Sequence, residues 1–207
     1  TSQRQHAGEW GTDTVTAAND AVIAATAPES HNPASATFVA AVLEAGLVTY
    51  ANVGDSRAYW LRDAAPGVQL SEDDSVAQQM IAAGFTREQA ETSPQAHAIT
   101  KWLGRDARDT APRVGQLAVT GPGWLLVCSD GLWNYASEPT AIQDQIRASG
   151  TTEPAALALA LVAFANAQGG IDNITVTLAR VAGVAGPPSG QNADTGAVPV
   201  AQEETHG

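Results

Sequence analysis

The sequence has little sulfur and little positive charge. Its 207 residues include one cysteine, Cys128, which excludes an internal disulfide bond and a cysteine-rich zinc site. Ten basic residues, with Lys101 the only lysine, stand against 22 acidic residues and give a formal net charge of −12. Because cationic side chains that neutralise phosphates supply most nucleic-acid affinity, we expect neither nucleic acid nor an anionic membrane as a partner.

Long apolar runs are also lacking. No stretch reaches the roughly 20 uncharged apolar residues of a membrane-spanning helix, and no basic segment followed by an apolar one marks a secretory signal. Hydrophobic residues nevertheless make up 44% of the chain, which is near the value for globular proteins. We therefore expect one folded, soluble, cytoplasmic domain with a sizeable core.

Hydrophobic periodicity predicts both helices and strands. Helices are expected over 12–27, 76–84, 86–90, 137–150 and 152–170, and strands over 37–43, 47–53, 58–61, 114–119, 124–128 and 173–181. Residues 1–11 show no periodic pattern, whereas 124–128 is almost continuously apolar and predicts a strand buried on both faces. This order favours an α+β domain of antiparallel sheets with helices packed outside.

The composition changes at Gly183. From there to the last residue it is rich in Gly, Pro, Ala, Gln and Glu and has no periodicity. We predict a domain over 1–182 and a disordered, acidic tail or linker over 183–207.

Three aspartates lie at predicted strand ends beside turn-forming residues. Asp55 separates two strands, Asp130 follows the buried strand, and Asp172 precedes the last one. Carboxylates at the edge of a sheet can converge on one cleft, and Mg²⁺ and Mn²⁺ take oxygen ligands. Each aspartate alone is by default an ordinary turn residue, and Arg57 is compatible with a salt bridge to Asp55; three such aspartates at strand ends favour a metal site more than one does. The spacing alone leaves both interpretations open.

Five segments, read in order, resemble the PP2C-like (PPM) metal-dependent serine/threonine phosphatases. They are ANVGDSRA (51–58), QLSEDDS (69–75), ITKWLG (99–104), WLLVCSDGL (124–132) and GGIDNITV (169–176). The similarity extends from about Thr12 to Val181. It implies an α-β-β-α sandwich of two antiparallel sheets flanked by helices, with a two-metal centre at one edge and a flap over about 71–104.

The resemblance also implies roles for individual residues. Asp130 and Asp172 would bind two catalytic Mn²⁺ or Mg²⁺ ions and Asp55 a third, weaker one. The supporting residues would be Ser129, Gly131, Asn173 and Arg57. A hydroxide bridging the metals would attack the phosphorus of phosphoserine or phosphothreonine without a covalent enzyme intermediate, so Cys128 is expected to be a small core residue. The expected partners are phosphorylated proteins, substrates of a Ser/Thr kinase, and a monomer is expected.

The N-terminal region departs from the family pattern. The family begins with an Arg/Glu-Asp segment and an Asp-Gly-x-Gly-Gly turn that supply a phosphate-binding arginine, one metal ligand and the aspartate that bridges the metals. No Asp-Gly occurs before Ser35, and no aspartate precedes Asp13. Asp74 stands where the family often has histidine. We expect the chain to be the C-terminal three-quarters of such a domain.

Two other hypotheses remain. One is a complete, non-catalytic relative, a pseudophosphatase that serves as a protein-binding module. The chain is also compatible with a regulatory phosphatase of the sporulation type, which shares the fold.

Overall fold

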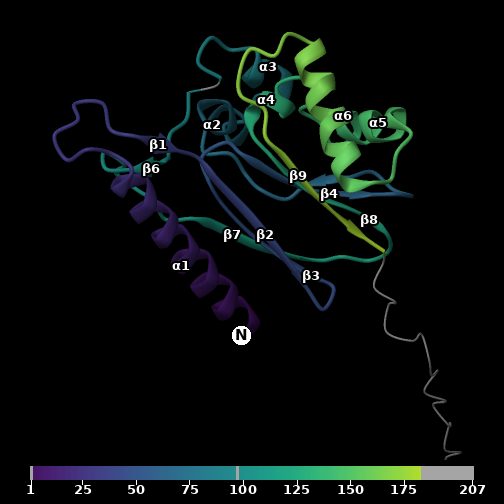
Figure 1. The fold of residues 1–207 in the computed structure, drawn as a ribbon, viewed down its shortest axis with the longest axis horizontal. Helices are drawn as coiled ribbons and strands as arrows, with labels where there is room; N and C mark the ends of the chain where they lie inside the picture. Colours follow the sequence, from purple (N-terminus) through teal and green to yellow (C-terminus); the bar gives the residue numbers. More distant parts are fainter. Residues whose placement is uncertain (1, 97, 183–207) are drawn as a thin grey trace, which may run out of the picture.

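The computed structural model describes residues 2–96 and 98–182, whose helices and strands form a layered body (Figure 1). The helices are α1 (Ser2–Ala24), α2 (Val76–Ala82), α3 (Arg87–Glu91), α4 (Asp130–Trp133), α5 (Pro139–Ser149) and α6 (Pro154–Ala167). The strands are β1 (Ser35–Ala36), β2 (Phe38–Glu44), β3 (Leu47–Val53), β4 (Arg57–Arg62), β5 (Val68–Gln69), β6 (Leu103–Gly104), β7 (Arg113–Ala118), β8 (Gly123–Cys128) and β9 (Val176–Val181). The tail predicted over 183–207 lies outside the described residues.

Two antiparallel sheets form the centre of the fold. One has the strand order β5-β4-β8-β9 and the other β2-β3-β7, while β1 and β6 form a separate short pair. Val48, Trp60 and Leu125 belong to the buried cluster between the two sheets. Strands β2 and β3 are joined by a two-residue turn, Ala45 and Gly46, both with positive φ, which suits a tight hairpin.

Helices cover the outer faces of both sheets. Helices α4, α5 and α6 pack on the four-stranded sheet and enclose the largest core cluster, which includes Leu132, Ile142 and Leu161. On the other side α1 packs through Val15 against Val53 and Leu103. Figure 1 shows α1 along one side of the strands and α5 and α6 along the other. The predicted α-β-β-α sandwich is confirmed.

Strand β8 is buried on both faces, as its apolar run predicts. Trp124, Leu126 and Cys128 point into the cluster under the helices. Leu125 belongs to the cluster between the sheets. The strand lies between β4 and β9, so its backbone is paired on both edges as well. Cys128 is 2% exposed and is a core residue, as expected.

Helix α1 begins ten residues before the predicted start at residue 12, which is a correction to the sequence analysis. The helix buries a stripe spaced by four residues, namely Ala7, Gly11 and Val15. A Cβ at Gly11 would lie 2.5 Å from a methyl group of Val114 on β7, so the helix packs closely on the sheet. Small residues carry little hydrophobic signal, and the first half of the helix therefore shows no periodicity in the sequence.

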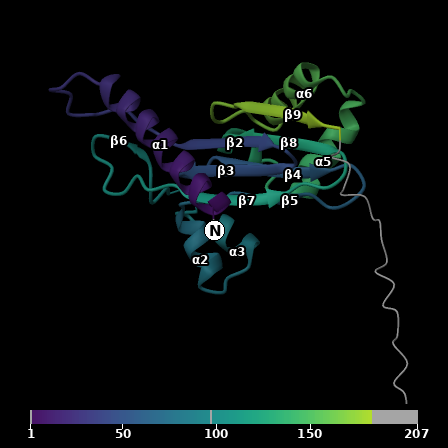
Figure 2. The same cartoon turned by 90° about the horizontal axis from the view of Figure 1, so that it is seen from below.

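The region predicted to be a flap contains α2 and α3. These helices form a small core of their own through Ala77, Ala90 and Ala96, and Figure 2 shows them projecting from the body on the side away from α6. The Thr86 hydroxyl caps α3 by accepting from the Gln89 backbone N–H, and the Gln89 side-chain oxygen accepts from the Thr86 backbone N–H, which completes the capping box. Among the described residues no single helix combines the length and apolar character of a membrane span; only α5 and α6 together do, across a 115° bend.

Candidate metal site

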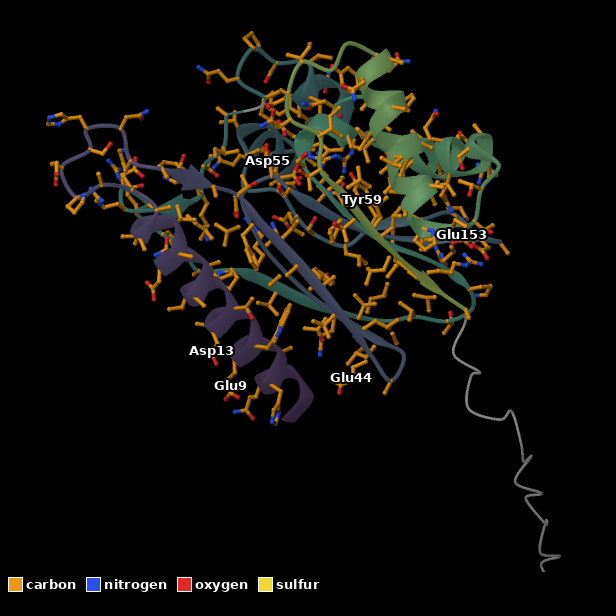
Figure 3. All side chains as sticks on the ribbon, in the orientation of Figure 1. Glu9, Asp13, Glu44, Asp55, Tyr59 and Glu153 are labelled. Atoms are coloured by element: carbon orange, nitrogen blue, oxygen red, sulfur yellow. The ribbon has the colours of Figure 1, made fainter. Side chains whose placement is uncertain are left out.

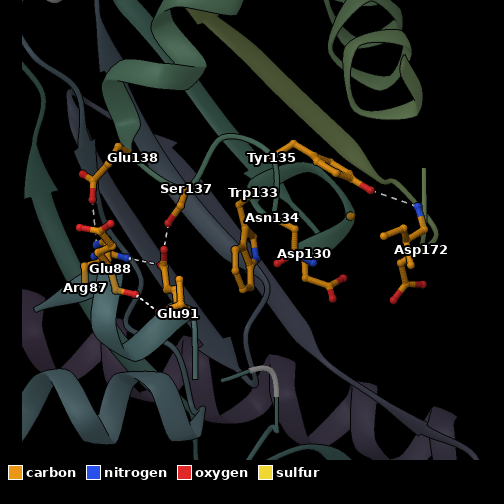
Figure 4. A pocket seen from close by; sticks show the side chains of 13 residues that line it. Arg87, Glu88, Glu91, Asp130, Trp133, Asn134, Tyr135, Ser137, Glu138 and Asp172 are labelled. Atoms are coloured by element: carbon orange, nitrogen blue, oxygen red, sulfur yellow. Dashed lines mark hydrogen bonds and ion pairs between the residues drawn. The ribbon is translucent and has the colours of Figure 1, made fainter. Parts of the chain in front are cut away.

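A pocket of about 760 Å³ opens where α3, α4 and the segment before β9 meet (Figure 4). Asp130 and Asp172 both line it, so the structure brings these two predicted residues to one cavity although 42 positions separate them in the chain. The opposite end is formed by charged side chains of α3 and the segment before α5, namely Arg87, Glu88, Glu91 and Glu138. In Figure 4 Trp133 lies between these two ends.

The end of β8 positions Asp130. The strand ends at Cys128, Ser129 takes an extended backbone conformation as the N-cap, and Asp130 is the first residue of α4. A carboxylate in the first turn of a helix is favoured by the exposed backbone N–H groups there. Asp130 is thus held on rigid structure, between a central strand and a helix whose Leu132 is fully buried.

Ser129 ties the two aspartate segments together. Its hydroxyl donates to the Asn173 carbonyl at 3.0 Å and accepts from the Thr175 backbone N–H at 3.0 Å. The Ser129 N–H donates to the Thr175 carbonyl at 3.1 Å. These bonds align the chain just before Asp130 with the chain just after Asp172.

Gly131 and Asn173 allow close approach of the same segments. A Cβ at Gly131 would lie 2.4 Å from the Asn173 carbonyl oxygen, nearer than any side chain can come. The Asn173 N–H donates to Asp172 Oδ1 at 2.6 Å and orients that carboxylate. Ser129, Gly131 and Asn173 thus fix the backbone on which the two aspartates stand, and their supporting role in a metal site stays a prediction.

Asp55 lies deeper than the other two aspartates. It is 6% exposed, in the turn between β3 and β4, and its carbonyl accepts a hydrogen bond from Trp133 Nε1 at 2.9 Å. Figure 3 shows it within the body, whereas Glu9 and Glu153 lie at the surface. Burial, followed by the nearby charges of Asp130 and Asp73, raises its pKa to about 6. Asp55 thus stands behind Asp130, and its assignment to a third metal stays a prediction.

The ion pair of Arg57 is with Asp73 and not with Asp55. Nε of Arg57 lies 3.0 Å from both Asp73 carboxylate oxygens, and Nη2 lies 2.7 Å from Oδ2. Both side chains are almost completely buried. Asp55 was one alternative partner because it is close in the chain, but the turn directs the guanidinium away along β4 toward the loop before α2.

Asp74 occupies the position where the family often has histidine. It is 3% exposed; Oδ2 accepts from the Gly54 N–H at 3.1 Å, and Oδ1 accepts from Arg113 Nε at 2.9 Å. It therefore fixes the loop before α2 against the Gly54-Asp55 turn and β7.

Several residues that line the pocket were not found from the sequence. Tyr135 accepts a hydrogen bond from the Ile171 N–H at 3.2 Å and so holds the segment beside Asp172. Arg87 pairs with Glu91 at 3.1 Å and with Glu138 at 2.9 Å. An acid four residues after Arg87 on α3 was a visible signal for the first pair only.

The donor set fits part of a divalent-metal site. Asp130 and Asp172 offer the hard oxygen atoms that Mg²⁺ and Mn²⁺ take. Within residues 2–96 and 98–182, however, no group of three or more His, Cys, Asp or Glu side chains is placed to hold a metal ion. Mg²⁺ commonly keeps several waters and needs only one or two protein carboxylates. An ion between these aspartates would fill its other positions with water, substrate or groups outside the described residues.

Stacked antiparallel sheets with helices outside and two aspartates at one edge define the class of fold, and comparisons with known proteins define the family. No protein-family profile matches the chain. The serine/threonine phosphatase Stp of Listeria monocytogenes is 34% identical over 151 residues, which are 71% of this chain and 57% of Stp.

Solved structures of serine/threonine phosphatases are also similar to this chain. The PPM Ser-Thr phosphatase MsPP from Mycobacterium smegmatis, solved with cacodylate, is similar with a TM-score of 0.67 and 31% identity, over 81% of this chain and 71% of MsPP. The catalytic domain of PstP, solved with two manganese ions, is similar with a TM-score of 0.54 and 28% identity, over 69% of this chain and 56% of that one.

The chain belongs to the PPM (PP2C-type) serine/threonine phosphatase family, which confirms the resemblance seen in its motifs. It spans little more than half the length of Stp, 57%.

Proposed function

We propose that the intact protein is a metal-dependent phosphatase that removes phosphate from phosphoserine and phosphothreonine in proteins. The observation that carries this proposal is the meeting of Asp130 and Asp172 on the wall of one pocket. In a family of serine/threonine phosphatases, the use of such a pair is phosphate-ester hydrolysis. PstP, a relative, was solved with two manganese ions, which supports Mn²⁺ or Mg²⁺ as the cofactor here.

Electrostatics explains why a cation is needed. A phosphate monoester is an anion, and two carboxylates in the same pocket would repel it. Asp130 and Asp172 would hold divalent ions, which supply charge neutralisation of the phosphoryl oxygens and activation of water. Hydrogen bonds of Ser129 and Asn173 keep both carboxylates in place, so that little reorganisation is needed during the reaction.

Cys128 is not among the residues that line the pocket, so it is not placed for a covalent route through a thiol. Cys128 is buried in the core under the helices, and burial raises its pKa to about 12. A thiol with that pKa is protonated at neutral pH and is a poor nucleophile. This supports direct attack by water, with the metal-bridging hydroxide of the family as the proposed nucleophile.

The test is hydrolysis of p-nitrophenyl phosphate and of a phosphothreonine peptide by the intact protein, with and without Mn²⁺. We expect metal-dependent turnover that is abolished by Asp130→Asn and by Asp172→Asn, with melting temperatures close to the wild type. The matched control is Asp144→Asn, an exposed aspartate on α5 paired with Arg147. Absence of metal-dependent turnover in the wild type would overturn the proposal.

A second candidate function is that of a pseudophosphatase, a module that binds phosphoproteins without turnover. It is favoured by the absence, within residues 2–96 and 98–182, of any group of three or more metal-holding side chains. Binding of a phosphopeptide without hydrolysis in the presence of Mn²⁺ would select it. Hydrolysis would exclude it.

A further inference from the structure

Arg57 touches three of the segments around the pocket, although it does not itself line the cavity. It is the first residue of β4, and its side chain is 3% exposed. The Asp73 carboxylate accepts hydrogen bonds from Nε and Nη2 of the guanidinium and neutralises its charge. The remaining donors, on Nη1 and Nη2, reach other segments of the chain.

Nη1 and Nη2 reach the wall opposite the aspartates. Nη1 of Arg57 donates to the Ser137 hydroxyl at 3.1 Å, and Nη2 lies 3.4 Å from Glu91 Oε1. Ser137 in turn donates to the same Glu91 oxygen at 2.7 Å. Both Ser137 and Glu91 line the pocket. Arg57 therefore joins α3 to the segment that precedes α5.

The face of the same guanidinium contacts the helix that begins with Asp130. Its central carbon lies 3.7 Å from the centre of a Trp133 ring, within cation–π distance. Trp133 is the last residue of α4, and its Nε1 donates to the carbonyl of Asp55. One buried side chain on a rigid sheet strand thus contacts α3, α4 and the link between α4 and α5.

Helix α3 contributes no residue to the large apolar clusters at the sheets. Its buried residue, Ala90, packs in the small cluster with Ala77 and Ala96, separate from the large clusters at the sheets. Apolar burial therefore holds α2 and α3 to each other, and the polar contacts of Glu91 hold α3 to the pocket. Figure 4 shows the ion pairs and the Ser137 contact that converge there.

We propose that Arg57 is a positioning residue that anchors α3, through Glu91 and Ser137, at a fixed place opposite the aspartates. The anchored wall then determines how the chain on either side of a phosphorylated residue is admitted. This extension rests on the proposed function. A small ester such as p-nitrophenyl phosphate reaches the aspartates without touching this wall, whereas a phosphopeptide lies along it.

Two variants test the anchor. Glu91→Gln keeps the shape and the Ser137 contact but removes the charge that Arg57 and Arg87 face. Arg57→Lys keeps the charge beside Asp73 but lacks the fork that reaches the other partners. The control variants come from a more exposed arginine–aspartate pair that does not line the pocket: Arg180 binds Asp63 through two contacts of 2.7 and 2.6 Å and lies 5.1 Å from the Trp124 ring. They are Asp63→Asn and Arg180→Lys.

The first measurement is backbone hydrogen exchange in the intact protein, followed by mass spectrometry. We expect exchange over residues 87–92 to become about tenfold faster in Glu91→Gln and Arg57→Lys, with residues of α6 unchanged, because local opening of α3 becomes easier. The control variants should leave exchange in α3 as in the wild type. Unchanged exchange over 87–92 in both test variants, or equal acceleration throughout the chain, would overturn the anchoring role.

The second measurement is kinetic. For Glu91→Gln we expect KM for a phosphothreonine peptide to rise about fivefold relative to KM for p-nitrophenyl phosphate, with kcat for the peptide nearly unchanged. Equal losses on the two substrates would contradict the proposed role in admission. If the wild type hydrolyses neither substrate, the proposed function fails, while the exchange experiment still decides whether Arg57 anchors α3.

Discussion

Gly131 and Asn173 are 42 positions apart in the chain and lie in contact, with the Asn173 carbonyl oxygen 2.4 Å from the place where a Cβ of Gly131 would be. The contact lies one residue beyond Asp130 and one beyond Asp172. The separation of the two carboxylates therefore depends on a position that has no room for a side chain.

Gly131→Ala should lower both stability and activity. The added methyl group must push apart β8–α4 and the segment before β9, at a cost of about 1–3 kcal/mol. Because the aspartates move with these segments, affinity for Mn²⁺ should fall too, measured by calorimetric titration. The control is Gly8→Ala on α1, where nothing lies within 4 Å of the new Cβ; it should be neutral or stabilise by about 0.5–1 kcal/mol. Unchanged Mn²⁺ affinity in Gly131→Ala would contradict the argument.

The contribution of Glu91 to stability should disappear in acid. Partial burial raises the pKa of Glu91. Hydrogen bonds from Ser137 and Arg87 lower it, and the net effect is a pKa below the usual value. A group with a lowered pKa stabilises the fold above its unfolded pKa, about 4.3 for glutamate, and loses this effect as pH falls through the folded value. Urea denaturation should show Glu91→Gln less stable than wild type by about 1 kcal/mol at neutral pH. The difference in stability should shrink toward zero as the pH falls below the unfolded pKa and through the lowered folded pKa.

Glu9→Gln, an exposed position on α1, is the control for this pH series. Its stability difference from wild type should stay small throughout. If the stability difference between Glu91→Gln and the wild type grew as the pH fell, the pH dependence would have the opposite sign to the one expected. That result would exclude the assigned ion pairs.

The Cys128 thiol should be inert in the folded protein. It is 2% exposed, and burial raises its pKa to about 12, so almost no thiolate is present near pH 8. Ellman's reagent should therefore detect no thiol in the native protein and one per chain in urea. Phosphatase activity should survive treatment with iodoacetamide under native conditions. Rapid modification of the native protein would show that β8 or α4 opens readily.

Gln143→Met should destabilise the domain without affecting the pocket chemistry. The buried amide donates to the carbonyls of Arg62 and Ala65 and accepts from the Gly67 N–H, so it holds the loop between β4 and β5. Methionine fills similar space but leaves three backbone groups without these partners, at a cost of about 2–3 kcal/mol. Gln145→Met on the same helix is the control for the helical substitution. Thermal melting measures both, and equal melting temperatures would contradict the assigned role.

The sequence predicted most of the elements, because their signals are local. The starts at Pro139 and Pro154 and the stop at Gly150, which has φ 65°, are short-range backbone preferences. Helix α4 was missed because its four residues are too few to show a period. The short pair β1–β6 was missed because two-residue strands depend on their distant partners and not on their own composition.

The site was predictable only in part. Asp130 and Asp172 stand in recognisable motifs at strand ends, and the sheet edge brings them to one pocket. The contacts of Arg57 and Ser137 with Glu91 join positions 34 and 46 residues apart. Nothing in the local sequence marks such partners, since these residues meet only when segments far apart in the chain pack together. The choice of Asp73 over Asp55 by Arg57 has the same origin.

Strand β8 gives alternate side chains to the interior between the sheets and to the interior beneath the helices, and its last residue is followed directly by Ser129 and Asp130. Melting of either layer would therefore release the strand from one side and displace the carboxylate at its end. No partly unfolded form that keeps only one layer should retain the site, so inactivation by heat and loss of the fold should follow the same curve.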